Sequence, residues 1–134
     1  MGEALDIVHR FFDRFAAGEM DAADELFADD CAFVMPMGPM TKAEHRGMGE
    51  AFRVGIPDGH MVVDHALDHG DEVFLEGRFV GQHTGDLASP GGTLPASGRK
   101  LELRFADYFK TAGGKVVEHR TYFDQASLLQ QLSG

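Results

Sequence analysis

The spacing of apolar residues changes near residue 60, and this change limits the possible fold more than any other feature of the chain. Before it, apolar residues such as Leu5, Val8 and Phe11 recur every three or four positions, as on one face of a helix. After it, apolar and polar residues alternate within four stretches, as is typical of strands. These stretches are residues 61–69, 72–83, 99–110 and 115–124. Helices followed by strands predict an α+β fold, with the helices on one face of a curved antiparallel sheet.

Three helices are expected before the change. The first falls within residues 3–20 and has its apolar side chains on one face. The second is expected within residues 21–30, and a short apolar strand follows over residues 31–37. The third begins at Thr41, because Thr41 and Glu44 have the spacing of a capping box.

A long connection separates the second and third of the alternating stretches. Residues 84–98 read TGDLASPGGTLPASG, and a connection of this length inside a compact fold indicates a functional lid or a disordered excursion. Neither an internal repeat nor an interdomain linker is visible elsewhere in the sequence. Because 134 residues are enough to bury one core, residues 1–134 are expected to form a single domain.

The chain is acidic, with 22 acidic residues against 12 lysines and arginines and a formal net charge of −10. Nucleic acids and anionic membrane surfaces are therefore not expected as partners, because both attract a positive face. No apolar run approaches the roughly 18 residues of a membrane span, and no signal peptide is visible, which favours the cytoplasm. His60 and His65 would lie on opposite faces of a strand, so no metal site is expected.

The stretch at residues 72–83 places a histidine at the end of an apolar row. Alternate side chains of this stretch share one face, and the row ends at His83, where the chain enters the long connection. Gly77 and Gly81 belong to the same row, which indicates a sharp bend or a close approach of another backbone. His83 is therefore a candidate for a pocket residue.

The stretch at residues 99–110 places a carboxyl group, that of Asp107, in an otherwise apolar row. The other members of this row are Leu101, Leu103, Phe105 and Phe109. Burying a carboxyl group without partners is costly, so Asp107 is expected to be hydrogen-bonded or protonated.

Two registers are open for the final strand opposite Asp107. A tight turn at Ala112 and Gly113 would place Asp107 opposite Glu118. The side chains on the same face would then be Arg120, Tyr122 and Asp124. A bulge of one residue would replace that row with the next one. Its members are Val117, His119, Thr121 and Phe123.

A further acid, Asp124, directly follows Tyr122 and Phe123 near the end of the chain. A solvated tail does not need aromatic residues beside a carboxylate, and a core strand does not need the carboxylate. The combination indicates an acid at the rim or the floor of a pocket.

Several segments together resemble a known family. They are AGEMDAADELFADDCAFV after the first helix, GQHTGD, ASGRKLELRFADYF, and GGKVVEHRTYFDQASLLQQL at the end. With them, the chain resembles nearly end to end the SnoaL-like polyketide cyclases and ester cyclases of the nuclear transport factor 2-like superfamily. The closing segment is the most specific of the four.

This resemblance implies a cone-shaped, strongly curved antiparallel sheet with three N-terminal helices enclosing a pocket. It also implies a cofactor-free intramolecular aldol condensation on a polyketide ester. In that reaction an aspartate transfers protons, and its motif position falls on Asp124. A base must remove a proton next to a carbonyl and an acid must protonate the new oxygen, so the chemistry suits a carboxyl group.

Two related families give narrower comparisons. Ketosteroid isomerases are similar in fold, and their aspartic acid donor matches Asp107, but their base and tyrosine match Met35 and Phe11. Limonene epoxide hydrolases end similarly in an aspartate, yet no acid lies two residues after Arg78, where their arginine–aspartate pair is expected. The resemblance therefore favours a cyclase over either of these enzymes.

The resemblance thus implies a cofactor-independent SnoaL-like cyclase that acts by acid–base chemistry on a polyketide-like or other apolar carbonyl compound. The candidate catalytic residues are Asp124, Asp107, His83 and His119. The candidate substrate-binding residues are Phe11, Phe15, Met35, Phe52, Phe79, Phe105 and Tyr122. The alternatives are a non-catalytic module that binds a small molecule, and an epoxide hydrolase or isomerase that uses the same pocket. A homodimer is expected, because relatives often pair through the outer face of the sheet.

Overall fold

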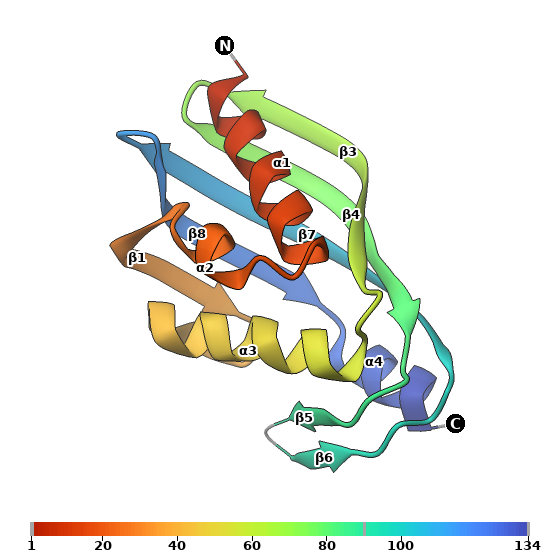
Figure 1. The fold of residues 1–134 in the computed structure, drawn as a ribbon. Coiled ribbons are helices and arrows are strands. Elements are labelled where there is room, and N and C mark those ends of the chain that lie inside the picture. Colours follow the sequence, from red (N-terminus) through yellow and green to blue (C-terminus); the bar gives the residue numbers. More distant parts are fainter. Residues whose placement is uncertain (1, 90, 134) are drawn as a thin grey trace.

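The computed structural model describes residues 2–89 and 91–133, and its main feature is a curved sheet of six strands (Figure 1). The strands lie in the order β2-β1-β8-β7-β4-β3. Their bounds are β1 Phe27–Met35, β2 Gly38–Met40, β3 His60–His69, β4 Glu72–Gln82, β7 Lys100–Ala112 and β8 Lys115–Phe123. Neighbouring strands are antiparallel except β1 and β8, which are parallel. The predicted α+β class and its large antiparallel sheet are confirmed, with one parallel pair that was not expected.

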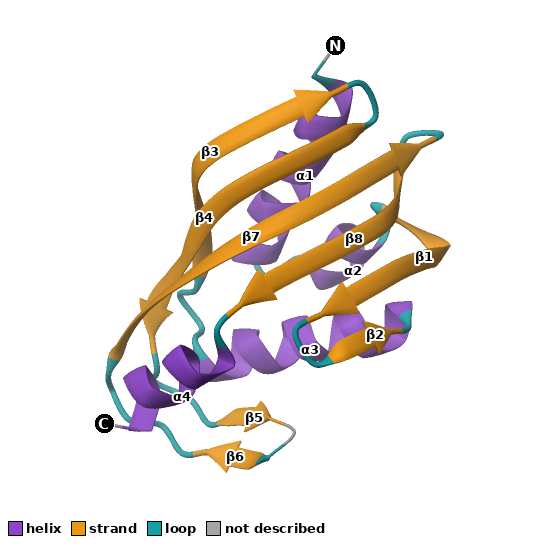
Figure 2. Cartoon of the chain, turned by 180° about the vertical axis from the view of Figure 1, so that it is seen from behind, coloured by secondary structure: helices purple, strands orange, loops and turns teal. Residues whose placement is uncertain are grey.

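Helices cover one face of the sheet and leave the other face open (Figure 2). The three helices on the covered face are α1 (Glu3–Ala16), α2 (Met20–Asp24) and α3 (Lys42–Gly55). The buried side chains of α1 are Ala4, Ile7, Val8, Phe11, Phe12 and Phe15. The helical spacing of these residues explains why α1 packs on the sheet along one side. None of the described helices is both long and apolar enough to cross a membrane.

The third helix begins at the predicted capping box. The Thr41 hydroxyl accepts a hydrogen bond from the Glu44 backbone N–H at 3.1 Å. The Glu44 carboxylate accepts one from the Thr41 N–H at 2.9 Å. Both bonds satisfy N–H groups that the helix itself cannot pair, and they fix the first turn of α3.

The register between β7 and β8 decides which side chains face the helices. A shift near the turn pairs Asp107 with Thr121. His119 is therefore buried beneath the helices, and Thr121 and Phe123 face the same side. This row corresponds to the bulged alternative, and the register that placed Asp107 opposite Glu118 is wrong.

The second helix is shorter than expected, because the chain enters the sheet earlier. Residues 21–30 were expected to be helical, but α2 ends at Asp24 and β1 starts at Phe27. The backbone N–H of Val116 donates to the carbonyl of Leu26 at 2.8 Å, which ties the end of this segment to β8. Tertiary pairing thus outweighs the local helix preference.

The long connection contains a small hairpin that was not expected. Its strands are β5 (Leu87–Ser89) and β6 (Gly92–Leu94). Leu87 is buried against the end of α3, where an added Cβ at Gly55 would lie 2.8 Å from the Cβ of Leu87. This contact anchors the hairpin to the helical layer.

The tail forms a helix, α4 (Gln125–Ser133), which the alternation in the preceding strand did not indicate. Leu128 and Leu132 lie one turn apart on α4, and both are buried. Gln131 bonds to the backbone of Glu102 through both atoms of its amide, at 2.9 and 3.0 Å. The helix is therefore fixed against the start of β7.

Gly81 of β4 lies where the backbone approaches the end of α3 closely. A Cβ added to Gly81 would lie 2.3 Å from Cγ2 of Ile56 and 2.9 Å from Oδ1 of Asp58. Such separations are far below an ordinary van der Waals contact. The close approach expected at this glycine is confirmed.

We predict that Gly81→Ala lowers the free energy of unfolding by about 1–3 kcal/mol, because the added methyl group overpacks the site. Gly47→Ala on α3 is the matched control, since a Cβ added there would meet no atom within 4 Å apart from its chain neighbours and the backbone of its own helix. That control is expected to raise stability by up to about 1 kcal/mol. Urea denaturation of both variants measures the difference, and equal stabilities would contradict the packing described for Gly81.

Candidate active site

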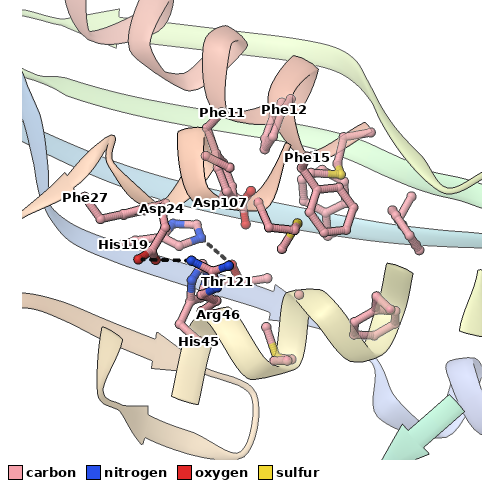
Figure 3. Close-up of a pocket in the computed structure, with 18 of the residues that line it drawn as sticks. Phe11, Phe12, Phe15, Asp24, Phe27, His45, Arg46, Asp107, His119 and Thr121 are labelled. Carbon is pink, nitrogen blue, oxygen red and sulfur yellow. Dashed lines mark hydrogen bonds and ion pairs between the residues drawn. The ribbon is translucent and has the colours of Figure 1, made fainter. Parts of the chain in front are cut away.

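A cavity of about 120 Å³ lies between the helices and the covered face of the sheet (Figure 3). Its wall is mainly aromatic and is built by Phe11, Phe12, Phe15, Phe27, Phe52, Phe79, Phe105 and Phe123. Its polar side chains are few. They are Asp107, His119 and Thr121 from the sheet, His45 and Arg46 from α3, and Asp24 from α2.

Asp107 is the carboxyl group inside this apolar wall. Only 4% of the residue is exposed, and its Oδ1 atom has no hydrogen-bond partner among the described residues. Burial raises the pKa of Asp107 to about 7, and the hydrogen bond with Thr121 opposes that shift. Near neutral pH the carboxyl group is therefore able both to accept and to donate a proton.

Asp107 belongs to a chain of hydrogen bonds that links side chains of the neighbouring strands β7 and β8. His119 Nδ1 lies 3.2 Å from the carbonyl oxygen of Tyr108, so this nitrogen carries the proton and donates it. His119 Nε2 then has a free lone pair, which accepts a hydrogen bond from the Thr121 hydroxyl at 3.2 Å. The Thr121 side chain also bonds to Asp107.

The single proton of the Thr121 hydroxyl cannot serve both neighbours at once. When Asp107 is protonated, its O–H donates to the Thr121 oxygen, and the threonine donates to His119. When Asp107 is ionised, the threonine hydroxyl turns to donate to the carboxylate. This hydroxyl therefore holds the carboxyl group in place in both of its protonation states.

Burial also keeps the two cavity histidines neutral. It lowers the pKa of His119 to about 3, with a further contribution from His45. It lowers the pKa of His45 to about 4. The two rings meet edge to face, with their centroids 5.4 Å apart. Since neither ring is charged at neutral pH, neither supplies a cation that would stabilise the Asp107 carboxylate.

Ion pairs between α2 and α3 lie at the more exposed side of the cavity. The guanidinium of Arg46 lies 2.7 Å from the Asp21 carboxylate, 3.4 Å from Glu50 and 4.0 Å from Asp24. Lys42 of α3, which is not part of the cavity wall, lies 3.3 Å from Asp29 of β1. The cations of this rim are thus already paired with acids.

The structure places seven of the residues predicted from the sequence on the cavity wall. They are Asp107, His119, Phe11, Phe15, Phe52, Phe79 and Phe105. Their roles in binding and catalysis remain predictions. His45 also lines the cavity, and the sequence analysis missed it.

The prediction that Asp124 faces the pocket is wrong. Asp124 is exposed, and its Oδ1 accepts hydrogen bonds from the backbone N–H groups of Ala126 at 2.9 Å and Ser127 at 3.3 Å. These bonds cap the N-terminus of α4. The carboxylate follows the aromatic residues because a helix begins there.

His83 is buried as expected, but it does not line the cavity. Its Nδ1 lies 2.8 Å from the Ser97 hydroxyl, and its backbone bonds to Gly98 and Arg99. His83 therefore joins the two ends of the long connection, and the placement predicted for it in the pocket is wrong.

Two predicted wall residues lie elsewhere. Met35 is buried in the core but is not part of the cavity wall. Tyr122 is 50% exposed, because the register of β8 turns it to the open face of the sheet. Both placements predicted from the sequence are wrong.

The charged groups of the hydrolase alternative do not meet in the cavity. Arg78 binds the Asp64 carboxylate through two hydrogen bonds of 3.0 Å and contacts Glu102 at 3.3 Å. All three residues lie outside the cavity wall. Within residues 2–89 and 91–133, no three His, Cys, Asp or Glu side chains are grouped as metal ligands.

Comparison with known families finds one match over almost the whole chain. The sequence profile described as SnoaL-like polyketide cyclase matches residues 6–132. Among curated proteins, no sequence matches the chain significantly.

Solved structures share the fold at low sequence identity. AclR from Streptomyces galilaeus, provisionally described as a hydroxylase, is 18% identical with a TM-score of 0.87, over 99% of this chain and 82% of AclR. IdmH from Streptomyces antibioticus, provisionally described as a polyketide cyclase, is 23% identical with a TM-score of 0.81, over 98% and 99% of the two chains. An NTF2-like protein of unknown function from Burkholderia pseudomallei is 15% identical with a TM-score of 0.77, over the full length of both. The predicted nuclear transport factor 2-like fold is confirmed.

The raised pKa of Asp107 predicts how its removal changes the pH dependence of stability. Between the usual pKa of 3.8 and about 7, the folded protein binds more protons at this site than the unfolded chain, so stability falls as the pH rises. The loss approaches about 1.4 kcal/mol per pH unit. Asp107→Asn has no proton to lose, so it is expected to gain stability relative to the wild type from pH 4 to pH 7. Denaturation across this range measures the difference, and parallel curves would contradict the raised pKa.

Proposed function

This chain belongs to the SnoaL-like polyketide cyclase family, and we propose that it catalyses a cofactor-independent, aldol-type cyclisation of an apolar carbonyl compound. The residue that moves the proton is Asp107 rather than Asp124. One observation carries this proposal: Asp107 is a carboxyl group enclosed by aromatic rings, with one oxygen unpaired and a pKa of about 7.

The proposed reaction uses Asp107 first as a base and then as an acid. The carboxylate removes a proton from the carbon next to a carbonyl group, which leaves an enolate and a protonated Asp107. The enolate carbon attacks a second carbonyl in the same molecule, forming the carbon–carbon bond and an alkoxide. Protonated Asp107 gives its proton to this alkoxide and returns to the carboxylate, so the enzyme is unchanged.

The surroundings of Asp107 support this sequence of steps. The phenylalanines that line the cavity make its wall apolar, and hydrogen bonds to a developing negative charge are stronger in such surroundings than in water. His119 is neutral, so it does not form an ion pair that would hold Asp107 ionised. Thr121 bonds to the carboxyl group in either protonation state and fixes its position.

The size of the cavity supports a small reacting group. A cavity of about 150 Å³ is known to hold benzene, so about 120 Å³ is close to the space of one small ring and no more. Pockets for drug-sized ligands are larger, at roughly 300–1,000 Å³. The ring being closed would occupy the cavity, and any longer part of the substrate would extend out of it.

We predict that Asp107→Asn slows proton removal from a ketone by about a hundredfold or more. Acetophenone in deuterated water provides the assay, because NMR follows the exchange of its methyl protons. Exchange by the wild type should rise as the pH passes through about 7, since the carboxylate is the active form. A wild type that binds acetophenone without accelerating exchange would contradict the proposal and favour a module that only binds.

Asp124→Ala is the control that separates the two acids. It removes the cap of α4 and is expected to cost about 1 kcal/mol of stability, with the exchange rate unchanged. Asp124→Asn keeps a capping side chain and is expected to change neither property. Loss of exchange in both Asp124 variants, together with retention in Asp107→Asn, would restore the assignment made from the sequence.

The expected homodimer stays a prediction, and the open face of the sheet is the surface that fits it. Leu67, Phe74 and Tyr122 are exposed on this face, at 76%, 49% and 50%. The pairs Arg78–Asp64 and Arg120–Glu118 add charges of both signs, so two copies of the face are able to complement each other. Sedimentation equilibrium is expected to give twice the mass of the 14.6 kDa chain, and a monomer would contradict the prediction.

A further inference from the structure

His45 is a polar side chain of the cavity that the steps above do not use. It lies in the first turn of α3, lines the cavity and is 7% exposed. Burial is the cause that lowers its pKa, and its imidazole has no hydrogen-bond partner among the described residues. The ring nitrogens are not among the fully enclosed unpaired atoms, so they open into the cavity and are able to pair with a ligand there.

The position of the His45 ring is fixed on several sides. The ring stacks on Phe33, with centroids 4.2 Å apart and an interplanar angle of 21°. It meets Phe27 edge to face at 5.2 Å. The backbone N–H of His45 donates to the carbonyl of Thr41 at 2.9 Å, within the turn that the capping box stabilises. A group held in this way needs little reorganisation to bind a ligand.

The surroundings keep His45 neutral and able to donate a hydrogen bond. The N-terminus of α3 carries partial positive charge, which disfavours an imidazolium in its first turn, in the same direction as burial. A neutral imidazole has one N–H donor and one acceptor nitrogen. It donates to a ligand oxygen without adding a charge to the cavity.

Two unpaired groups thus reach the cavity from opposite layers of the molecule. Asp107 comes from β7 in the sheet and His45 comes from α3 in the helical layer (Figure 3). His119 offers no donor to a ligand, because its Nδ1 proton bonds to Tyr108 and its Nε2, which faces Thr121, carries no proton. A ligand that pairs both free groups must carry two oxygen functions.

The ligand should also be uncharged. Arg46 is the only Lys or Arg among the described residues of the cavity wall, and acids of α2 and α3 already pair it. An anionic ligand would therefore lack a counter-charge within the cavity, and the acids at the rim would repel it.

We propose that His45 is a second catalytic residue of this cavity, where it donates a hydrogen bond to one carbonyl oxygen of a compact, uncharged dicarbonyl substrate while Asp107 exchanges the proton. The inference rests on the proposed function, because a cyclisation of this kind joins two carbonyl groups of one molecule. The hydrogen bond from His45 strengthens as the carbonyl oxygen becomes an enolate.

Binding of 4-nitrophenol tests this inference without any turnover. The probe has a single ring with an oxygen function at each end, and its phenol and phenolate forms differ in absorbance. Calorimetry at about pH 5.5, where nearly all of the probe is the neutral phenol, is expected to show binding to the wild type. His45→Phe keeps a planar ring but removes the donor, so affinity should fall by roughly tenfold to a hundredfold. His45→Gln, which retains an N–H donor, should recover part of the loss.

His9→Phe is the matched control, because His9 is exposed on the outer side of α1, and it should bind the probe as the wild type does. If His45→Phe does not fold, the ¹⁵N signals of the His45 ring in the wild type give a second readout and should move when 4-nitrophenol is added. A wild type that does not bind the probe, unchanged affinity in His45→Phe, or unmoved ring signals would each overturn the inference. Retained exchange in Asp107→Asn would instead overturn the proposed function, so the two failures are distinguishable.

Discussion

The removal of water from the Asp107 carboxyl group is the interaction on which the rest of this account depends. A carboxylate in an aromatic cavity without a paired cation is costly, so burial raises its pKa to about 7. The same loss of solvation keeps His45 and His119 neutral. One physical cause therefore produces a carboxyl group that exchanges protons near neutral pH, and two histidines that do not compete with it for charge.

The fold produces this environment by packing helices on a sheet. Inward-facing side chains recur every three or four residues in the helices and every second residue in the strands. Alternation along β7 points Asp107 away from solvent, between Phe105 and Phe109 on the same face. The register shift between β7 and β8 then sets Thr121 opposite it. Helical spacing in α1 places Phe11, Phe12 and Phe15 on the side of the helix that lines the same cavity. A shift of one residue in β8 would replace Thr121 by a side chain of the outer face and leave Asp107 without its partner.

The sequence predicts the parts of this site that follow from a repeating pattern. The alternation around Asp107 places its side chain on the buried face of the sheet. The glycines in the apolar row of β4 predict the close approach at Gly81. Asp124 could not be placed in this way, because its role depends on a helix that begins directly after it. His45 shares the spacing of Met48 and Phe52 on the inner side of α3, so a signal for it was present in the sequence. The bulge that turns Tyr122 outward is a local irregularity, and no repeating pattern encodes it.

A ¹³C NMR titration of the Asp107 side chain tests the central claim most directly. The carboxyl signal reports the protonation of this one group, whichever substrate the enzyme uses, and the Asp107→Asn variant identifies it by its loss. The account predicts a midpoint near pH 7 for this signal. A midpoint near the ordinary value of 3.8 would show that the carboxyl group is solvated or paired with a cation, and it would contradict the account.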